Sequence, residues 1–210
     1  MYLAHILGAS CAFLVALLLR MLYVILWLNG RIPKVKSRRH PVRTMIVLGS
    51  GGHTTEILRI ITTMKLERYS PRIYVRASTD TISEAKVRTL EGTATDYQVF
   101  DIRRSREVRQ SYSASVITTL LATFDSIPLV WTQNPDLILC NGPGTCVPLC
   151  IVIFFFKLMF LTNARIIFIE SFCRVKTLSL SGKMLYYLAD FVIVRWKYLN
   201  TYLYRRTVYL

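Results

Sequence analysis

From residue 44 onward, short apolar runs alternate with longer amphipathic stretches. Continuous apolar runs are typical of strands buried on both faces of a parallel sheet, and apolar positions at helical spacing are typical of the helices that cover it. The pattern predicts strands over residues 44–48, 71–75, 97–102, 136–140, 165–169 and 191–194, and helices over 54–64, 81–90, 113–121, 147–161 and 182–188. This alternation predicts an α/β fold with a doubly wound, mostly parallel sheet, whose ligands bind at the carboxyl ends of the strands.

Ahead of this region, residues 1–28 are almost wholly apolar. At about 1.5 Å per residue, such a run is long enough to cross about 30 Å of hydrocarbon. The run lacks the basic start and the small-residue cleavage site of a secretory signal peptide. We therefore predict a transmembrane anchor over residues 1–28.

Arg20 interrupts the predicted anchor. A charged side chain near the membrane interior is costly unless it reaches the interface or finds a partner. One interpretation is that the span ends near Arg20, with Tyr23 and Trp27 as aromatic anchors in the interface. The exact bounds of the membrane segment therefore stay open.

A basic segment over residues 29–43 comes after the anchor. It contains no acid and carries Arg31, Lys34, Lys36, Arg38, Arg39 and Arg43. By the positive-inside rule this segment is cytosolic, so the N-terminus faces the lumen or the exterior. Pro33 and Pro41 indicate a linker rather than a helix. A nucleic-acid-binding arm is the competing interpretation, but a basic cluster beside a membrane span is more simply a contact with anionic lipid.

Composition indicates one domain with an appendage. The chain has 210 residues, 53% of them apolar, which is enough for one good core. Its net charge of +15 indicates an acidic partner, and the anchor favours an anionic membrane surface over nucleic acid. Beyond the anchor and the linker we expect a Rossmann-like domain over residues 44–197 and a tail over 198–210. Aromatic and basic residues alternate in the tail, so it either docks a partner or packs on its own domain.

The main candidate site is the turn in TMIVLGSGGHTTE, residues 44–56. Its glycines permit a sharp turn and a close approach to a ligand, and the helix after it presents free N–H groups and a positive dipole end. These features predict a phosphate site, although a purely structural turn is the alternative. The loop fits neither the Walker nor the dinucleotide-binding pattern. The candidate binding residues are Gly49, Ser50, Gly51, Gly52 and Thr54.

His53 lies at the start of the predicted helix, beside the turn. A histidine at this position can act as a general base or contact a sugar or phosphate, and the alternative is that it only caps the helix. Thr54 and Thr55 can also cap this helix.

Two further predicted strands end in polar residues. The strand over 136–140 leads into a second glycine turn before a helix, with candidate binding residues Asn141, Gly142, Gly144 and Thr145. The strand over 165–169 leads into Glu170 and Ser171. Glu170 either orients a substrate hydroxyl or pairs with a nearby basic residue.

Two other segments have alternative interpretations. Residues 103–110 are strongly basic, and they form either a solvated loop or a loop that faces phosphate or the membrane. The predicted helix over 147–161 is apolar all round but shorter than the roughly 20 residues of a spanning helix. It is either a buried core helix or one that dips into the membrane surface with Lys157 reaching out to the interface.

The chain has five cysteines, Cys11, Cys140, Cys146, Cys150 and Cys173, and no C-x-x-C pair. We expect the last four to be buried free thiols, which fits a reducing compartment. The cysteine pattern indicates neither a zinc site nor disulfides.

Three motifs occur in order after the anchor: VLGSGGHTTEIL, CNGPGTCVPL and IFIESFCRVKTLSLSGKMLYYLADFVIVRW. With them the chain resembles the asparagine-linked glycosylation protein fourteen family, the membrane-anchoring subunit of the two-part UDP-N-acetylglucosamine (UDP-GlcNAc) transferase of the dolichol pathway. The resemblance covers nearly the whole chain. The first motif also resembles, more locally, the glycine loop of the bacterial enzyme that adds N-acetylglucosamine (GlcNAc) to a lipid-linked cell-wall precursor.

This resemblance implies a split GT-B glycosyltransferase. The chain would supply the acceptor-side half over residues 44–197, and a separate soluble subunit would supply most of the UDP-GlcNAc site. Together they would add the second GlcNAc to GlcNAc-diphosphodolichol at the cytosolic face of the endoplasmic reticulum, in the synthesis of the N-linked glycan precursor. The resemblance implies no cofactor, no nucleic-acid partner and no activity of this chain alone.

Residue by residue, Gly49, Gly51 and Gly52 match the family loop, and His53 matches the histidine that closes it. An inverting transfer needs a base near the acceptor hydroxyl and stabilisation of the departing diphosphate. His53 is the first candidate for the base, with Glu56 and Glu170 as rivals. The glycine turns are better placed to bind diphosphate oxygens of the acceptor or the donor.

The alternative function is a non-catalytic membrane scaffold that only recruits a cytosolic enzyme. A pure scaffold should tolerate Gly52→Ala and His53→Ala, whereas half of an active site should not. A membrane-tethered nucleic-acid binder would require interleaved aromatic and basic residues on an exposed sheet face, and the buried pattern of the strands argues against it.

Overall fold

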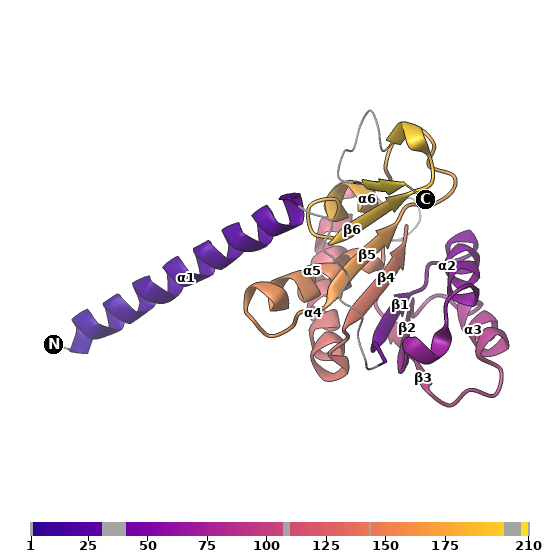
Figure 1. Ribbon diagram of the computed structural model, residues 1–210, viewed down its shortest axis with the longest axis horizontal. Coiled ribbons are helices and arrows are strands. Elements are labelled where there is room, and N and C mark those ends of the chain that lie inside the picture. The colour runs from indigo at the N-terminus through magenta and orange to yellow at the C-terminus, as the bar shows by residue number, and fades with distance from the viewer. Residues whose placement is uncertain (1, 31–40, 107–109, 143, 200–206, 210) are drawn as a thin grey trace.

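The computed structural model describes residues 2–30, 41–106, 110–142, 144–199 and 207–209. Its centre is a seven-stranded sheet in the order β3-β2-β1-β4-β5-β6-β7, and each neighbouring pair of strands is parallel (Figure 1). The strands are β1 (Thr44–Val47), β2 (Arg72–Ala77), β3 (Tyr97–Ile102), β4 (Leu137–Asn141), β5 (Arg165–Ile169), β6 (Phe191–Val194) and β7 (Thr207–Tyr209). The helices are α1 (Tyr2–Gly30), α2 (Gly52–Thr62), α3 (Ser83–Glu91), α4 (Tyr112–Gln133), α5 (Cys146–Leu158) and α6 (Leu180–Leu185), with a short 3₁₀ helix at Leu66–Arg68.

The strand order reverses at β1. The chain builds β1, β2 and β3 outward in one direction and then returns to the other side of β1 to begin β4. In open parallel sheets, ligands bind outside the carboxyl ends of the strands at such a switch point. The polar strand ends identified in the sequence come after β1, β4 and β5, which are neighbours in the sheet, so the fold brings them to one edge.

Different helices cover the two faces of the sheet (Figure 1). Along β1, Met45 and Val47 pack in a core with residues of α4, α5 and α6, whereas Ile46 and Leu48 pack in a second core with α2 and α3. This division arises from strand geometry, because successive side chains point to opposite faces. Both faces of β1 are therefore buried, as its continuous apolar run predicted.

The prediction for α4 was wrong in length. The helix continues to Gln133, past the predicted end at residue 121, with Pro128 inside it. A proline inside a helix lowers the stability of that helix, so in a sequence it usually predicts that the helix ends. In the structure Ser126 and Val130 are buried on either side of Pro128, so packing stabilises a helix that local propensity would interrupt.

The outer face of α4 is apolar and exposed. Its large side chains with more than a third of their surface exposed are Val116, Ile117, Leu120, Leu121, Phe124, Ile127 and Trp131. By length and composition alone, Ser113–Gln133 is a second helix that could cross a membrane. Because α4 connects β3 to β4 and packs on the sheet through its buried side, we interpret it as a covering helix with an apolar outer surface.

α5 is a core helix. Most of its residues are buried, and Lys157 is only 6% exposed. Lys157 Nζ donates to Asp190 Oδ2 at 2.7 Å, and burial lowers the pKa of Lys157 while this carboxylate opposes the effect. The alternative prediction, in which Lys157 reaches out from a membrane-dipping helix, is therefore wrong.

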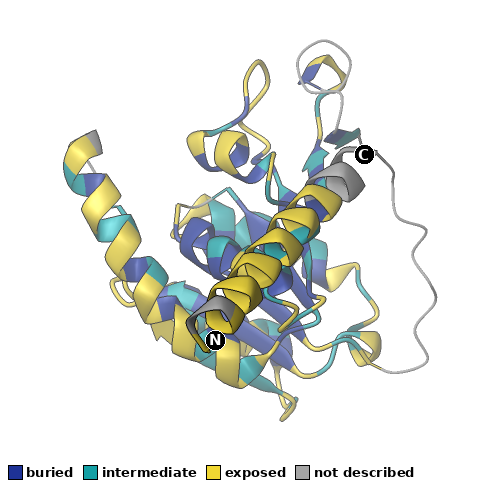
Figure 2. Ribbon diagram, turned by 90° about the vertical axis from the view of Figure 1, so that its left-hand side faces the viewer, coloured by how far each residue is buried: buried dark blue, intermediate teal, exposed yellow. Residues whose placement is uncertain are grey.

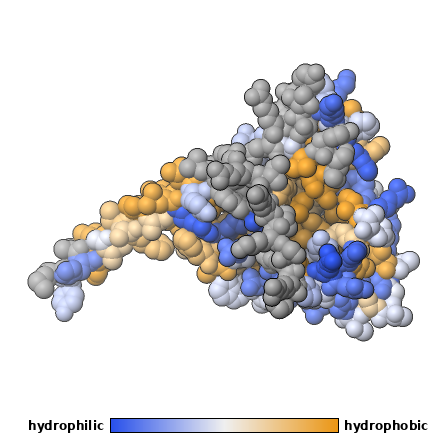
Figure 3. Space-filling model, in the orientation of Figure 1, coloured by the Kyte–Doolittle hydropathy of each residue, from blue (hydrophilic) through white to orange (hydrophobic). Residues whose placement is uncertain are grey.

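α1 projects away from the domain, and its surface is exposed along most of its length and mainly apolar (Figures 1, 2 and 3). Residues His5–Val24 are long and apolar enough to cross a membrane, and no part of that window is buried in the protein. The helix itself continues past Arg20 to Gly30.

Arg20 has partners in the domain. Its Nη2 donates to the carbonyl oxygen of Lys157 at 3.4 Å, and its guanidinium lies 4.4 Å from the centroid of the Phe160 ring. Val24, one turn further on, is 3% exposed. A cation is favoured at a helix C-terminus, and a guanidinium over an aromatic face adds to the attraction. Arg20 therefore attaches α1 to the C-terminal end of α5.

The tail contributes a strand that the sequence analysis did not predict. β7 pairs in parallel with β6, with Val208 opposite Ile193. Part of the segment assigned to partner docking thus extends the domain's own sheet. The linker residues 31–40 and the tail residues 200–206 lie outside the described residues, as do the side chain of Trp27 and those of Tyr202 and Tyr204.

Candidate functional site

The turn between β1 and α2 depends on Gly51. This residue is the N-cap of α2 and has φ +68°, a left-handed conformation that favours glycine. The predicted capping by Thr54 and Thr55 was wrong, because α2 begins at Gly52, ahead of both threonines. Thr54 is fully buried, and its hydroxyl donates to the carbonyl oxygen of Gly49 and contacts Ser83 Oγ at 2.6 Å. Thr54 thus supports the turn from beneath.

The N-terminus of α2 is available to an anion. It has no side-chain cap and no acidic residue in its first turn. The first N–H groups of a helix have no intrahelical partner, and the helix dipole places partial positive charge there. The turn therefore has the electrostatic character of a phosphate site.

His53, at the start of α2, is oriented by the end of β4. Its Nδ1 lies 3.1 Å from Asn141 Oδ1, and Asn141 is 2% exposed. An amide oxygen only accepts hydrogen bonds, so this contact places the proton of a neutral ring on Nδ1 and leaves Nε2 as an acceptor. Gly142 has φ +68°, and a Cβ on it would lie 2.6 Å from His53 Cε1. The backbone of β4 and the ring of His53 are therefore fitted closely together.

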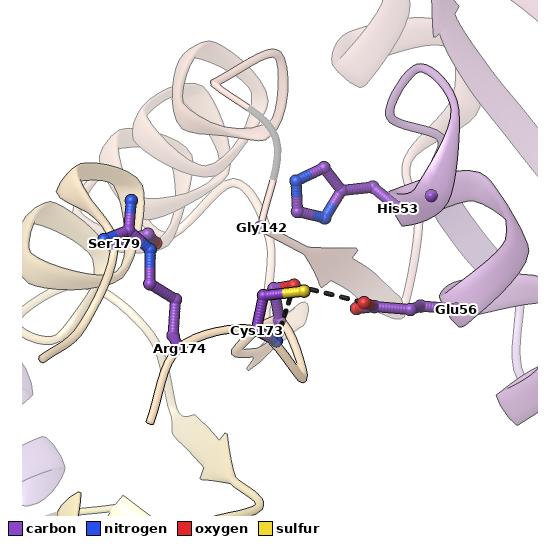
Figure 4. A pocket seen from close by; sticks show the side chains of 8 residues that line it. His53, Glu56, Gly142, Cys173, Arg174 and Ser179 are labelled. Carbon is purple, nitrogen blue, oxygen red and sulfur yellow. Dashed lines mark hydrogen bonds between the residues drawn. The ribbon is translucent and has the colours of Figure 1, made fainter. Parts of the chain in front are cut away.

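A cavity of about 320 Å³ opens beside this histidine (Figure 4). Its lining comes from α2, from the end of β4 and from the segment between β5 and α6: Gly52, His53, Glu56, Gly142, Ser171, Cys173, Arg174 and Ser179. Five of these residues were predicted from the sequence, and they come from all three predicted strand ends. Cys173, Arg174 and Ser179 were not predicted as site residues.

Glu56 and Ser171 connect the two sides of the cavity. Ser171 Oγ donates to Glu56 Oε1 at 3.1 Å (Figure 4), which joins α2 to the segment after β5. Arg174 lies in the same segment and is exposed in the cavity lining. Its position after a polar strand end was the only sequence signal for it, and the same signal is shared by many surface arginines.

Glu170 supports this segment from behind. It is 4% exposed, and its Oε2 accepts hydrogen bonds from Ser179 N at 2.8 Å and Ser179 Oγ at 3.1 Å. Its Oε1 accepts from Ser171 N at 3.0 Å. Glu170 is not among the residues that line the cavity, and its oxygens already bind donors of the chain itself. It fixes the segment over residues 171–179 at both ends.

The remaining predicted binding residues do not line the cavity. Gly49 is buried behind the first turn. Ser50 and Gly144 lie toward the loop after β3, where Arg104 Nη2 contacts Ser50 Oγ at 3.4 Å and a Cβ on Gly144 would lie 3.5 Å from Ser105 Oγ. Arg104 was part of the predicted basic loop but was not predicted as a site residue. Thr145 is the N-cap of α5.

Three cysteines are buried as expected, Cys140, Cys146 and Cys150, whereas Cys173 is exposed, contrary to the prediction. Burial raises the pKa values of the Cys140 and Cys146 thiols, so both are protonated at neutral pH. Cys146 therefore adds no negative charge to the N-terminus of α5. Within the described part of the chain, no group of three or more His, Cys, Asp or Glu side chains could hold a metal ion.

The fold is similar to that of Acinetobacter baumannii MurG, with a TM-score of 0.54 and 15% sequence identity. The similarity covers 74% of this chain and 41% of the MurG chain, so this chain corresponds to less than half of that protein. The predicted fold class is confirmed: an apolar N-terminal helix precedes a doubly wound, parallel sheet resembling one half of a GT-B glycosyltransferase.

Curated relatives match the chain over most of its length. The Mus musculus protein is 44% identical over 98% of this chain and 96% of its own length. The Homo sapiens protein is 44% identical over 82% of this chain, and the Yarrowia lipolytica protein is 43% identical over 91% of it. Each of the three is named UDP-N-acetylglucosamine transferase subunit ALG14.

A family model agrees with these relatives. The family described as "Oligosaccharide biosynthesis protein Alg14 like" matches residues 44–210, from the first strand of the sheet onward. That range contains the glycine turn, His53, Asn141 and the segment after β5. The chain therefore belongs to the Alg14-like family of oligosaccharide biosynthesis proteins, as its motifs predicted.

Proposed function

We propose that this chain is the membrane-anchoring, acceptor-side subunit of a two-subunit UDP-GlcNAc transferase. The observation that carries the proposal is His53, which is oriented by Asn141 beside a cavity and an uncapped helix N-terminus. The relatives are named as UDP-N-acetylglucosamine transferase subunits, which supports both the donor sugar and the presence of a second subunit. The reaction is the addition of the second GlcNAc to GlcNAc-diphosphodolichol.

In this proposal His53 Nε2 accepts the proton of the acceptor hydroxyl. The hydroxyl oxygen forms a bond to the anomeric carbon of the donor sugar while the bond from that carbon to the UDP oxygen breaks. The proton then passes from His53 to solvent, and UDP leaves. N–H groups at the start of α2 are donors for diphosphate oxygens and stabilise negative charge there.

A soluble partner supplies most of the donor site. GT-B enzymes close their site between two halves, and this chain corresponds to less than half of MurG. The cavity lined by His53 and Arg174 would face that partner. On this basis the chain is inactive alone.

Two parts of the chain support a position at the membrane: α1 with the basic segment after it, and the outer face of α4. In this proposal the apolar α1 spans the membrane of the endoplasmic reticulum, and the basic segment over residues 29–43 supports a cytosolic position of the domain. We also propose that the exposed apolar face of α4 lies against the membrane surface, because large apolar patches are uncommon on protein surfaces that face water.

The test is transfer of labelled GlcNAc from UDP-GlcNAc to a short-chain GlcNAc-diphospholipid. Membranes with this chain alone, with the partner alone and with both chains are compared. Product should form only with both chains and should carry two GlcNAc residues. Full activity of the partner without this chain would contradict a shared active site, and activity of this chain alone would contradict the need for a partner.

A further inference from the structure

Glu56 is the only carboxylate among the described residues that line the cavity. It comes three residues after His53 on α2, and side chains at this spacing lie on the same face of a helix. Figure 4 shows both side chains extending from α2 toward the same space. A ligand in contact with the imidazole of His53 would therefore lie within reach of the Glu56 carboxylate.

One oxygen of the Glu56 carboxylate is bound and the other is open. Ser171 Oγ donates to Oε1 at 3.1 Å, and within the described residues this is the only hydrogen bond to the carboxylate. Ser171 is itself fixed, because it is 7% exposed and its N–H donates to Glu170 Oε1 at 3.0 Å. The carboxylate is thus held in place while its Oε2 remains able to accept a hydrogen bond from a ligand.

The negative charge of Glu56 indicates which ligand group suits this side of the cavity. A carboxylate repels phosphate, but it accepts hydrogen bonds from hydroxyl groups. Arg174, the lining cation, lies across the cavity from Glu56 in Figure 4. The cavity volume of about 320 Å³ is at the lower end of the range of about 300–1,000 Å³ for ligand sites. Charge and size together favour one neutral sugar ring beside Glu56.

We propose that Glu56 binds a hydroxyl of the acceptor sugar next to the hydroxyl that reacts. The inference rests on the proposed function, in which His53 Nε2 accepts the proton of the reacting hydroxyl. A hydrogen bond from the neighbouring hydroxyl to Glu56 Oε2 restricts rotation of the sugar ring and directs the reacting hydroxyl toward His53. Glu56 is thereby assigned to sugar binding rather than to the role of the base.

The first test measures binding to the complex of this chain and its partner in detergent, without UDP-GlcNAc. The probes are a short-chain GlcNAc-diphospholipid and the same diphospholipid without its sugar. Glu56→Gln should bind the sugar-bearing probe about tenfold more weakly, because the hydrogen bond loses its charged acceptor. It should bind the sugarless probe as tightly as before or more tightly, because a negative charge is removed. Its amide oxygen still accepts from Ser171, so the melting temperature should stay close to that of the unmodified complex.

Glu67→Gln is the matched control for this change. Glu67 is exposed in the short 3₁₀ helix and does not line the cavity, so the substitution alters the charge of the chain by the same amount at a remote position. Both probes should bind this variant as they bind the unmodified complex. Equal losses for the two probes in Glu56→Gln would overturn the proposal, since a sugar-binding residue affects only the probe that carries a sugar.

A second test identifies the hydroxyl that Glu56 binds. It compares acceptor analogues that each lack one non-reacting hydroxyl of the sugar. One analogue should bind the unmodified complex about tenfold more weakly than the complete acceptor. Glu56→Gln should bind that analogue within about twofold of the complete acceptor, because the partner of the missing hydroxyl is already gone. Additive losses for every analogue would contradict the assignment.

Transfer assays on the same complexes distinguish a sugar-binding residue from a base. A fall in kcat of about 10²-fold or more in Glu56→Gln, with unchanged acceptor binding, would make Glu56 the base and overturn the proposal. A sugar-dependent loss of binding in a complex that transfers no GlcNAc would support the proposal and refute the proposed function.

Discussion

At the scale of single residues, the contact between His53 and Asn141 organises the site. Helix α2 supplies the histidine and strand β4 supplies the amide that selects its tautomer. The two residues are far apart in the sequence, so the contact depends on the parallel pairing of β1 with β4. Gly142 keeps the space that the imidazole ring occupies.

Replacing Gly142 with alanine should displace His53. The new Cβ would lie 2.6 Å from His53 Cε1, and the residue would also be strained at φ +68°. We expect kcat of the complex to fall at least about tenfold, because a general base contributes about 10²- to 10⁴-fold. Steady-state kinetics with both substrates provide the measurement.

Gly92→Ala is the matched control for this change. Gly92 has φ +58°, and a Cβ on it would meet nothing within 4 Å. It should lose about 1 kcal/mol of stability through backbone strain without any loss of kcat. Equal effects of the two substitutions on kcat would refute the steric role of Gly142.

Some residues of the site could be predicted from the sequence and others could not. The glycines and His53 were predictable, because a glycine turn before a helix has a recognisable local pattern. Glu170 was ambiguous, since a carboxylate at a strand end is equally consistent with chemistry and support. Cys173 and Arg174 could not be predicted as site residues, because their place in the cavity lining depends on the path of the segment after β5.

At the scale of elements, the segment between β5 and α6 shapes one wall of the cavity. Glu170 accepts hydrogen bonds at both ends of this segment, from Ser171 and from Ser179. The two roles considered for Glu170 make different predictions. If Glu170 is the base, removing its charge should abolish transfer. If Glu170 only supports the segment, transfer should fall when its hydrogen bonds to Ser171 and Ser179 are lost.

Glu170→Gln should therefore be milder than Glu170→Ala. The amide retains one acceptor oxygen for Ser179, whereas alanine leaves buried donors unpaired at a cost of about 1–3 kcal/mol. We expect glutamine to lower transfer less than about tenfold, in parallel with a lower melting temperature. A stable Glu170→Gln protein with no transfer would instead identify Glu170 as the base.

The strands were more predictable than the helices. Apolar runs located six strands to within about two residues, because burial on both faces requires continuous hydrophobicity. α4 was predicted too short, since Pro128 weakens the local signal while the buried Ser126 and Val130 sustain the helix. β7 was missed because a three-residue strand depends on the exposed edge of β6 rather than on its own sequence.

At the scale of the whole molecule, side chains of α1 contact the domain in addition to the covalent connection through the chain. Arg20 contacts the carbonyl oxygen of Lys157 and the ring of Phe160. The residue that weakened the membrane prediction therefore has a structural role. It connects α1 to the C-terminal end of α5.

Arg20→Leu should separate attachment from insertion. Leucine is more compatible with a membrane than arginine, so the chain should remain in carbonate-washed membranes. Transfer to the lipid acceptor should fall several-fold, because a looser domain is positioned less accurately over its substrate. Ser10→Leu, an equally apolar change at an exposed position of α1, should leave transfer unchanged. Equal activity of the two variants would show that Arg20 does not position the domain.

The measurement that tests the central claim most directly is transfer by the complex carrying His53→Ala. Co-purification of the partner must first show that the complex still forms. If the chain is half of the active site, kcat should fall about 10²- to 10⁴-fold while the partner remains bound. Full activity of this variant would show that His53 is structural and that the chain recruits an enzyme whose chemistry lies elsewhere.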